Sequence, residues 1–183
     1  LHLLDVNGAT RTVLDGLTIP NGIGWSPDGS TMYLVDSVPG VIIAFDFDPR
    51  TASVSDGRDL VTFDAEDGVP DGLTIDRAGR LWAAIYGAGR VDCYSPDGDL
   101  EQVIDLPAEQ TTSCAFAGPH LDRMYVTTAT EHWTDEQRRA APEAGIVYRV
   151  ESGATGRPAN PFAPDATWWS VTNFPIVRTG DQT

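Results

Sequence analysis

Short runs of alternating apolar and polar residues cover most of the chain and recur along it. The segment IPNGIGWSPDG begins at Ile19, and a closely similar segment, VPDGLTIDRAG, begins at Val69. β-Branched and aromatic residues dominate these runs, and Pro, Asp and Gly separate them, which is typical of short strands joined by tight turns. The pattern therefore predicts an all-β protein built from repeated units.

A third copy of the unit begins at Thr112, which takes the position that Asn21 and Asp71 occupy in the earlier copies. Each copy continues through two further strands, and more polar fourth strands are expected at 52–63 and 100–107. Units of about 40 to 50 residues with four antiparallel strands are typical of the blades of a β-propeller. A β-sandwich is the alternative, but a sandwich does not require successive units to resemble one another.

The predicted architecture is a partial β-propeller of about three and a half blades. One helix, TDEQRRAA, is expected inside an insertion at 131–144. Because closed propellers have about four to eight blades, these residues are expected to be a fragment of a longer protein, and the alternative is that two copies pair to close a ring. The propeller domain is expected at 1–165 and the unassigned tail at 166–183. The expected parts of the domain are the end of a blade (1–16), three blades (17–66, 67–109 and 110–151) and a closing segment (152–165).

Charge and composition narrow the classes of partner. The formal net charge of −15 repels phosphate groups, so neither a nucleic acid nor an anionic membrane is an expected partner. No apolar run approaches the ~18 residues that a membrane-spanning helix needs. Cys93 and Cys114 lack the spacing of metal ligands and are expected to be small buried thiols in a cytoplasmic protein. The oligomeric state is left open.

Asn21 and Asp71 stand where the innermost strands of two successive units begin. In a propeller these strand starts lie at one end of the central channel, so the two side chains are expected to converge there. Their oxygen atoms suit Ca²⁺ or Mg²⁺ and are tolerated by Zn²⁺ or Mn²⁺. The glycine after each is expected to let the backbone turn without a clash of a Cβ atom. The competing interpretation is structural, because Pro-Asn-Gly and Pro-Asp-Gly are common turn sequences.

Three motifs, in this order and spacing, resemble the gluconolactonase, regucalcin and senescence marker protein family: IPNGIGWSPDG, PDGLTIDRAGRLWAAIYGAGRV and TTSCAFAGPHLDRMYVTTA. The resemblance runs from about Leu3 to Phe162 and corresponds to the C-terminal portion of a family member. It implies a six-bladed propeller that binds one divalent cation, Ca²⁺ or Zn²⁺. It also implies a hydrolase of sugar-acid lactones, with a small-molecule lactone as its partner.

The resemblance also assigns site residues. The family's Asn and Asp metal ligands match Asn21 and Asp71, whereas its N-terminal Glu ligand has no counterpart in this sequence. The implied mechanism is metal-assisted hydrolysis with Asp71 as the catalytic base as well as a metal ligand. Thr112 either lines the substrate pocket or is a plain turn residue. An inactive truncated propeller that serves only as a binding or structural module is the alternative function.

Other chemistry finds less support in the sequence. No GxSxG motif is present, which argues against a serine hydrolase, and the glycines of IYGAGRV lead into a strand rather than a helix, which argues against a nucleotide site. The histidines share no ligand spacing and are expected at the surface or in turns: His2, His120 and His132. Three aromatic residues are expected to pack within the blades: Trp25, Trp82 and Tyr125.

Overall fold

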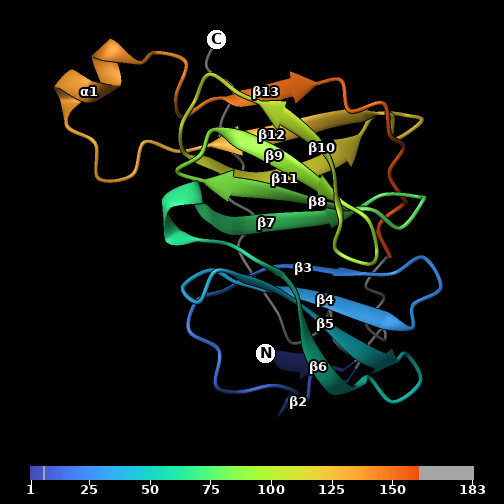
Figure 1. The fold of residues 1–183 in the computed structure, drawn as a ribbon. Helices are drawn as coiled ribbons and strands as arrows, with labels where there is room; N and C mark the ends of the chain where they lie inside the picture. Colours follow the sequence, from blue (N-terminus) through green and yellow to red (C-terminus); the bar gives the residue numbers. More distant parts are fainter. Residues whose placement is uncertain (6, 161–183) are drawn as a thin grey trace, which may run out of the picture.

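The computed structural model describes residues 1–5 and 7–160, and these form four antiparallel sheets (Figure 1). The all-β class predicted from the sequence is confirmed. The expected boundary at 165 and the tail at 166–183 lie outside the described residues. Sheet I contains β1 (His2–Leu4) and β2 (Thr10–Thr12), and sheet II contains β3 (Pro20–Trp25), β4 (Thr31–Asp36), β5 (Val41–Asp48) and β6 (Ser53–Thr62). Sheet III contains β7 (Val69–Ile75), β8 (Leu81–Tyr86), β9 (Arg90–Tyr94) and β10 (Leu100–Asp105). Sheet IV contains β11 (Thr111–Ala117), β12 (Arg123–Thr128) and β13 (Val147–Val150).

Within sheets II and III the strands follow one another in chain order, each paired with the next. The two polar fourth strands expected from the sequence are β6 and β10. Within the described residues two short helices interrupt the strands: the 3₁₀ helix η1 (Ala65–Asp67) precedes β7, and α1 (Asp135–Ala140) lies between β12 and β13. Sheets II and III thus each reproduce the repeated unit seen in the sequence.

An aspartate organises the turn after the first strand of sheets II and III. In the first turn, hydrogen bonds from Ser26 and Ser30 lower the pKa of Asp28 to about 2. In the second turn, the buried carboxylate of Asp76 accepts hydrogen bonds from the backbone N–H groups of Ala78 and Arg80, at 2.8 and 3.0 Å. These local bonds give each turn a fixed shape, as expected for Asp in tight turns.

The core consists of apolar layers between successive sheets. Strand β4 shows how it is built, because its side chains alternate between two layers. Met32 and Leu34 pack toward sheet I, whereas Tyr33 and Val35 pack against side chains of sheet III. Sheet III is buried on both faces in the same way, with Ile85 on one side and Trp82 on the other. A stack of four sheets differs from the two facing sheets of a sandwich.

The predicted burial of particular residues is confirmed in part. Cys93 and Cys114 are free, buried thiols, and desolvation raises the pKa of each to about 12. Trp82 is fully buried and Tyr125 is half-buried. The prediction for Trp25 is wrong, because 37% of this residue is exposed. Its ring lies edge-on to Phe47, with 5.8 Å between the ring centroids.

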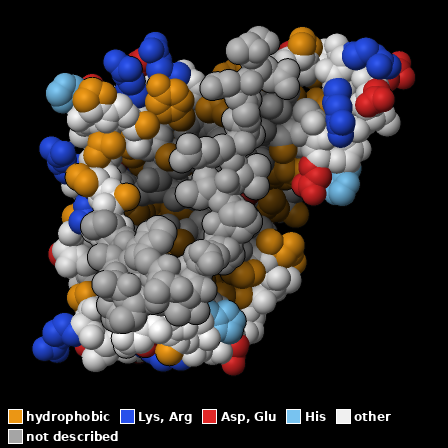
Figure 2. Space-filling view, turned by 180° about the vertical axis from the view of Figure 1, so that it is seen from behind, with side chains coloured by type: hydrophobic (Ala, Val, Ile, Leu, Met, Phe, Trp, Pro, Cys, Tyr) orange, Lys and Arg blue, Asp and Glu red, His pale blue; other side chains and the backbone are white. Residues whose placement is uncertain are grey.

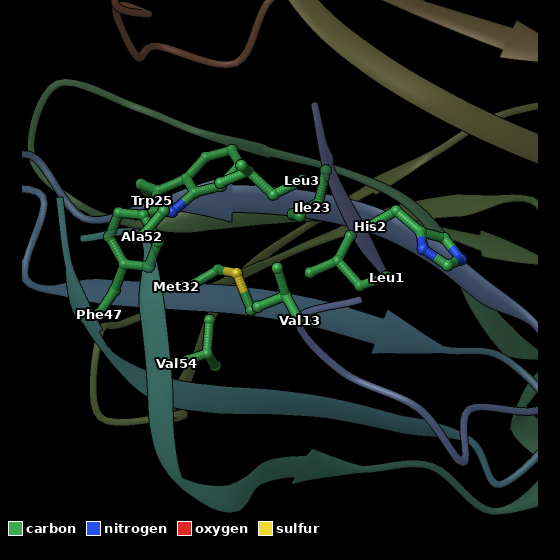
Figure 3. Close-up of a pocket in the computed structure, with 10 residues that line it drawn as sticks. All are labelled: Leu1, His2, Leu3, Val13, Ile23, Trp25, Met32, Phe47, Ala52 and Val54. Carbon is green, nitrogen blue, oxygen red and sulfur yellow. The ribbon is translucent and has the colours of Figure 1, made fainter. Parts of the chain in front are cut away.

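Trp25 and Phe47 border an apolar hollow of about 200 Å³ between sheet I and the outer side of sheet II. Figure 3 shows the side chains that line it, with Met32 and Val13 pointing into it. Neither Asn21 nor Asp71 lines this hollow. It is an imperfectly filled part of the packing between sheets I and II.

The first strands of sheets II, III and IV lie side by side, and glycines permit their close approach (Figure 1). A Cβ atom on Gly22 would lie 2.4 Å from the backbone nitrogen of Leu73. A Cβ on Gly72 would lie 2.7 Å from the Cα of Ser113. The expectation that a Cβ would clash at these two positions is confirmed, although neither glycine has a positive φ angle, so they bend the strands at bulges rather than form left-handed turns. They are needed because β3, β7 and β11 almost touch.

A segment near the end of the described chain ties the three larger sheets together. The carbonyl oxygen of Thr155 accepts a hydrogen bond from the backbone of Arg77, and Gly156 donates to the carbonyl of Leu121. The guanidinium of Arg157 donates to the carbonyl oxygens of Ser26 and Pro27, at 3.2 and 3.0 Å. We call this segment, residues 154–157, the strap, and it contacts the turn that comes after the first strand of each sheet.

The predicted helix in the insertion is confirmed as α1, and Thr134 and Gln137 cap its start reciprocally. None of its residues is buried, and Figure 2 shows basic and acidic side chains gathered on the lobe that projects at the upper right. Among residues 1–5 and 7–160 no helix has the length and apolar character needed to cross a membrane.

Candidate metal centre

The first strand of each larger sheet carries a β-bulge at the same place. In sheet II the register moves from Pro20 opposite Asp36 to Ile23 opposite Leu34, so that Asn21 and Gly22 share one partner residue. The corresponding irregularities lie between Pro70 and Leu73 in sheet III, and between Thr111 and Ser113 in sheet IV. A bulge bends a strand locally and re-aims the side chain of the extra residue.

Asn21, Asp71 and Thr112 all lie at these bulges. They belong to β3, β7 and β11, so the interpretation of Pro-Asn-Gly and Pro-Asp-Gly as simple turns is wrong. The hydroxyl group of Thr112 lies 2.7 Å from that of Thr127 on the neighbouring strand, and the two share a hydrogen bond. The structure therefore places Asn21, Asp71 and Thr112 at equivalent positions of three adjacent strands.

Asn21 and Asp71 are brought into contact across the junction of sheets II and III. The Asn21 side chain is exposed and hydrogen-bonds to the half-buried carboxylate of Asp71. Burial raises the pKa of Asp71, and the negative charge of Glu131 raises it further, against the opposing effect of the Asn21 hydrogen bond. The carboxylate is therefore incompletely compensated, and a cation beside it would supply the missing charge.

Residues of β4 hold the start of β3 in place. The buried carboxylate of Asp36 accepts hydrogen bonds from the backbone N–H groups of Thr18 and Ile19, at 2.8 and 2.7 Å. The next residue, Ser37, accepts a hydrogen bond from Nδ2 of Asn21 at 3.3 Å. Both the backbone and the side chain of this bulge are thus anchored to sheet II.

Two residues that lie near Asp71, Tyr86 and Glu131, were not predicted from the sequence. Tyr86, the last residue of β8, donates a hydrogen bond from its hydroxyl to Glu131 at 3.4 Å. Burial, followed by the negative charges of Glu131 and Asp71, raises the pKa of Tyr86. Glu131 could have been considered from the sequence, because it is the first residue of the insertion that sets the third unit apart from the other two.

Gln110 fixes Glu131 in this position. Its side-chain amide donates to the carbonyl oxygen of Glu131 at 3.1 Å and accepts from the backbone N–H of the same residue at 2.7 Å. The backbone of Gln110 also pairs with Tyr86 of sheet III and with Ala129 of sheet IV. The insertion is therefore attached at the junction of the two sheets.

The donor atoms suit a hard divalent cation, but few of them come together. An amide oxygen and a carboxylate are typical ligands of Ca²⁺, which takes 6–8 oxygen ligands. Across residues 1–5 and 7–160, no three His, Cys, Asp or Glu side chains are close enough to hold a metal ion jointly. Asn21 and Asp71 fit a cation site as part of its ligand set.

Comparison with known proteins identifies the family. The family model described as "SMP-30/Gluconolactonase/LRE-like region" matches residues 1–130. The chain belongs to this family. Its members of known structure have a propeller-type fold, and the stacked antiparallel sheets of this chain agree with that fold. The resemblance inferred from the three sequence motifs is confirmed.

Several members of the SMP-30/gluconolactonase family are similar to most of the chain. The putative sugar lactone lactonase YvrE of Bacillus subtilis is 36% identical over 166 residues, which is 90% of this chain and 57% of that protein. Regucalcin of Xenopus laevis is 37% identical over 153 residues, covering 83% and 50%. The crystal structure of a calcium-binding protein, regucalcin, from Agrobacterium tumefaciens matches with a TM-score of 0.77 at 33% identity, covering 82% and 51%. The chain spans about half the length of the curated relatives it matches.

Proposed function

We propose that the complete protein is a metal-dependent hydrolase of sugar-acid lactones and that this chain is a fragment of its six-bladed propeller. The observation that carries the proposal is the contact between Asn21 and Asp71, which two adjacent sheets bring together at equivalent bulges. Membership of the family and the similarity to a putative sugar lactone lactonase support it. A small lactone is the proposed substrate, and a cytoplasmic location stays a prediction.

Asn21 and Asp71 are the proposed ligands of one divalent cation, Ca²⁺ or Zn²⁺, with Mn²⁺ or Mg²⁺ as other candidates. When bound, the cation would polarise the lactone carbonyl and stabilise the negative charge that develops on its oxygen. Asp71 is also the proposed general base, which accepts a proton from the attacking water.

Tyr86 and Glu131 are proposed to contact the hydroxyl groups of the substrate. A sugar-acid lactone presents several hydroxyls, which donate to carboxylates and both donate to and accept from phenols. The Gln110 contacts hold the backbone of Glu131 so that its exposed carboxylate stands beside Tyr86. Thr112 is proposed to contribute to the same pocket.

A second function, as a binding or structural module without activity, is favoured by one specific observation. In the part of the chain that the structure describes, no three His, Cys, Asp or Glu side chains come together, so Asp71 lacks two further ligands of these types beside it. Two protein ligands are a small part of a Ca²⁺ shell, and water would complete it weakly.

Hydrolysis of glucono-δ-lactone distinguishes the two functions. The 183-residue chain would be assayed with Ca²⁺, Zn²⁺ or Mn²⁺ and with a chelator, beside Asp71→Ala and the exposed control Asp67→Ala. The lactonase proposal for this chain expects metal-dependent turnover that Asp71→Ala abolishes and Asp67→Ala retains. Turnover equal to the uncatalysed background would instead favour the inactive module.

A further inference from the structure

Ser37 connects the two candidate cation ligands through one hydroxyl group. It directly follows β4 and is 8% exposed. Its Oγ donates a hydrogen bond to the carbonyl oxygen of Pro70 at 2.7 Å and accepts one from Nδ2 of Asn21 at 3.3 Å. The carbonyl of Pro70 belongs to the peptide bond that leads to Asp71. A single atom of sheet II therefore touches the side chain of one ligand and the backbone of the other.

The hydroxyl proton determines the orientation of the Asn21 amide. A serine hydroxyl has one proton to donate, and the carbonyl of Pro70 can only accept. Ser37 therefore donates its proton to the carbonyl oxygen of Pro70 and can only accept a hydrogen bond from Asn21. The NH₂ end of the amide must then face Ser37, which turns its oxygen Oδ1 away.

The backbone around Asn21 is fixed separately from its side chain. Asp36 accepts the hydrogen bonds of Thr18 and Ile19, and the backbone N–H of Ser37 donates to the carbonyl of Ile19 at 3.0 Å. None of these bonds involves the side-chain hydroxyl of Ser37. Loss of that hydroxyl would therefore leave the course of the chain before Asn21 supported, while the amide would keep only its contact with Asp71 and lose the bond that fixes it to sheet II.

We propose that Ser37 is a positioning residue that presents Oδ1 of Asn21 to a cation and ties the Pro70–Asp71 peptide to the same point. This role rests on the proposed cation site at Asn21 and Asp71. Ser37 itself touches neither cation nor substrate. Removal of a group that orients a metal ligand typically weakens metal affinity about 10- to 100-fold, and we expect a loss in that range for Ser37→Ala.

Thr111 supplies a matched control. Its hydroxyl oxygen lies 2.6 Å from the carbonyl oxygen of Ile85 and 3.1 Å from that of Arg90, so it joins sheet IV to sheet III as Ser37 joins sheet II to sheet III. It is fully buried and makes no contact with the Asn21 amide. Thr111→Val therefore removes an inter-sheet hydroxyl bond without affecting the orientation of Asn21.

The test compares cation binding by the full chain with that of Ser37→Ala, Ser37→Thr and Thr111→Val. Binding is measured as Tb³⁺ luminescence, with Ca²⁺ as competitor, and thermal unfolding is recorded in parallel. We expect Ser37→Ala to bind about 10- to 100-fold more weakly, Ser37→Thr to regain most of the affinity, and Thr111→Val to lose stability but keep its affinity. Nuclear Overhauser effects are expected between the side-chain NH₂ of Asn21 and the β protons of Ser37.

Two results would overturn the role of Ser37 alone: unchanged affinity in Ser37→Ala while the wild-type chain binds, or equal loss of affinity in Ser37→Ala and Thr111→Val. Absence of the Overhauser contact would also overturn it, because the amide would then not face Ser37. If the wild-type chain binds neither Tb³⁺ nor Ca²⁺, the proposed cation site fails, and the role of Ser37 fails with it.

Discussion

At the scale of single residues, Asp71 is placed where its charge is disfavoured. Burial raises its pKa above the ordinary value of 3.8. A carboxyl group whose pKa is higher in the folded chain than in the unfolded chain binds protons more strongly when folded. The folded state therefore loses stability as the pH rises from 3.8 through the raised pKa. Above the raised pKa the metal-free chain carries this cost in full.

Asp71→Asn is expected to stabilise the metal-free chain at pH 7, because it removes a poorly compensated charge. The gain should disappear below about pH 3.8, where the wild-type carboxyl is protonated in both states. In Ca²⁺ at 100 times its Kd the order should reverse, because binding would stabilise only the wild-type chain, by about 2.7 kcal/mol. Thermal unfolding at both pH values, with chelator and with Ca²⁺, measures these effects.

Asp67→Asn is the control for this comparison, because Asp67 is exposed in η1 and lies outside the proposed site. It should leave stability nearly unchanged under every condition. If Asp71→Asn is no more stable than the wild-type chain in chelator at pH 7, the carboxylate is better compensated than the structure indicates.

At the scale of elements, the approach of β3 to β7 sets the geometry of the site. The two strands come so close that Gly22 faces the backbone of Leu73, and this contact brings Asn21 to Asp71. The bulges then turn both side chains away from the alternation of a regular strand. The position of the site therefore depends on strand packing as much as on the ligands themselves.

Gly22→Ala is expected to destabilise the chain by about 1–3 kcal/mol, the usual cost of overpacking. The added Cβ would lie 2.4 Å from a backbone nitrogen, which cannot move without displacing β7. Chemical denaturation measures the change in the free energy of unfolding. We also expect weaker cation binding, because displacement of β7 would separate Asn21 from Asp71.

Gly24→Ala provides a comparison within the same strand. Its Cβ would meet Cγ1 of Ile75 at 2.7 Å, and a side chain can adjust where a backbone cannot. The loss of stability should therefore be smaller than for Gly22→Ala. An equal or larger loss in Gly24→Ala would show that contact between the strand backbones is not the reason for glycine at position 22.

At the scale of the whole molecule, the strap connects parts of the chain that are far apart in sequence. Arg157 donates to the turn after β3, and Thr155 and Gly156 reach the turns after β7 and β11. These turns lie at the ends of strands whose starts carry Asn21, Asp71 and Thr112. The strap therefore holds the sheets together at the end opposite the candidate site.

Arg157→Ala is expected to lower the free energy of unfolding by about 1 kcal/mol, because it removes charge-assisted hydrogen bonds to Ser26 and Pro27. For a chain of this size that corresponds to a fall of about 2–4 °C in Tm. Arg50→Ala is the control, since Arg50 is exposed and its guanidinium pairs with the neighbouring Asp48. Equal Tm values for the two variants would contradict a tie between distant sheets.

Much of the fold and half of the site could be predicted from the sequence. The alternation of apolar residues and the turn sequences determined the strands, because both signals are local and depend on β-propensity and turn chemistry. The repeat placed Asn21, Asp71 and Thr112 at equivalent positions, and the structure brings the first two into contact. The family was also evident from the order of three motifs, and the match over residues 1–130 confirms it.

The remaining features depend on contacts between residues that are distant in sequence, and only the tertiary structure decided them. Gly22 resembles a turn residue in the sequence, yet its role comes from the backbone of Leu73 on another sheet. Trp25 has the alternation of a core residue, yet it borders an incompletely filled hollow and stays partly exposed. Ser37 and Glu131 gain their proposed roles only where sheets meet. Local pattern determines which residues form strands, whereas the packing of one sheet on the next determines which side chains share a site.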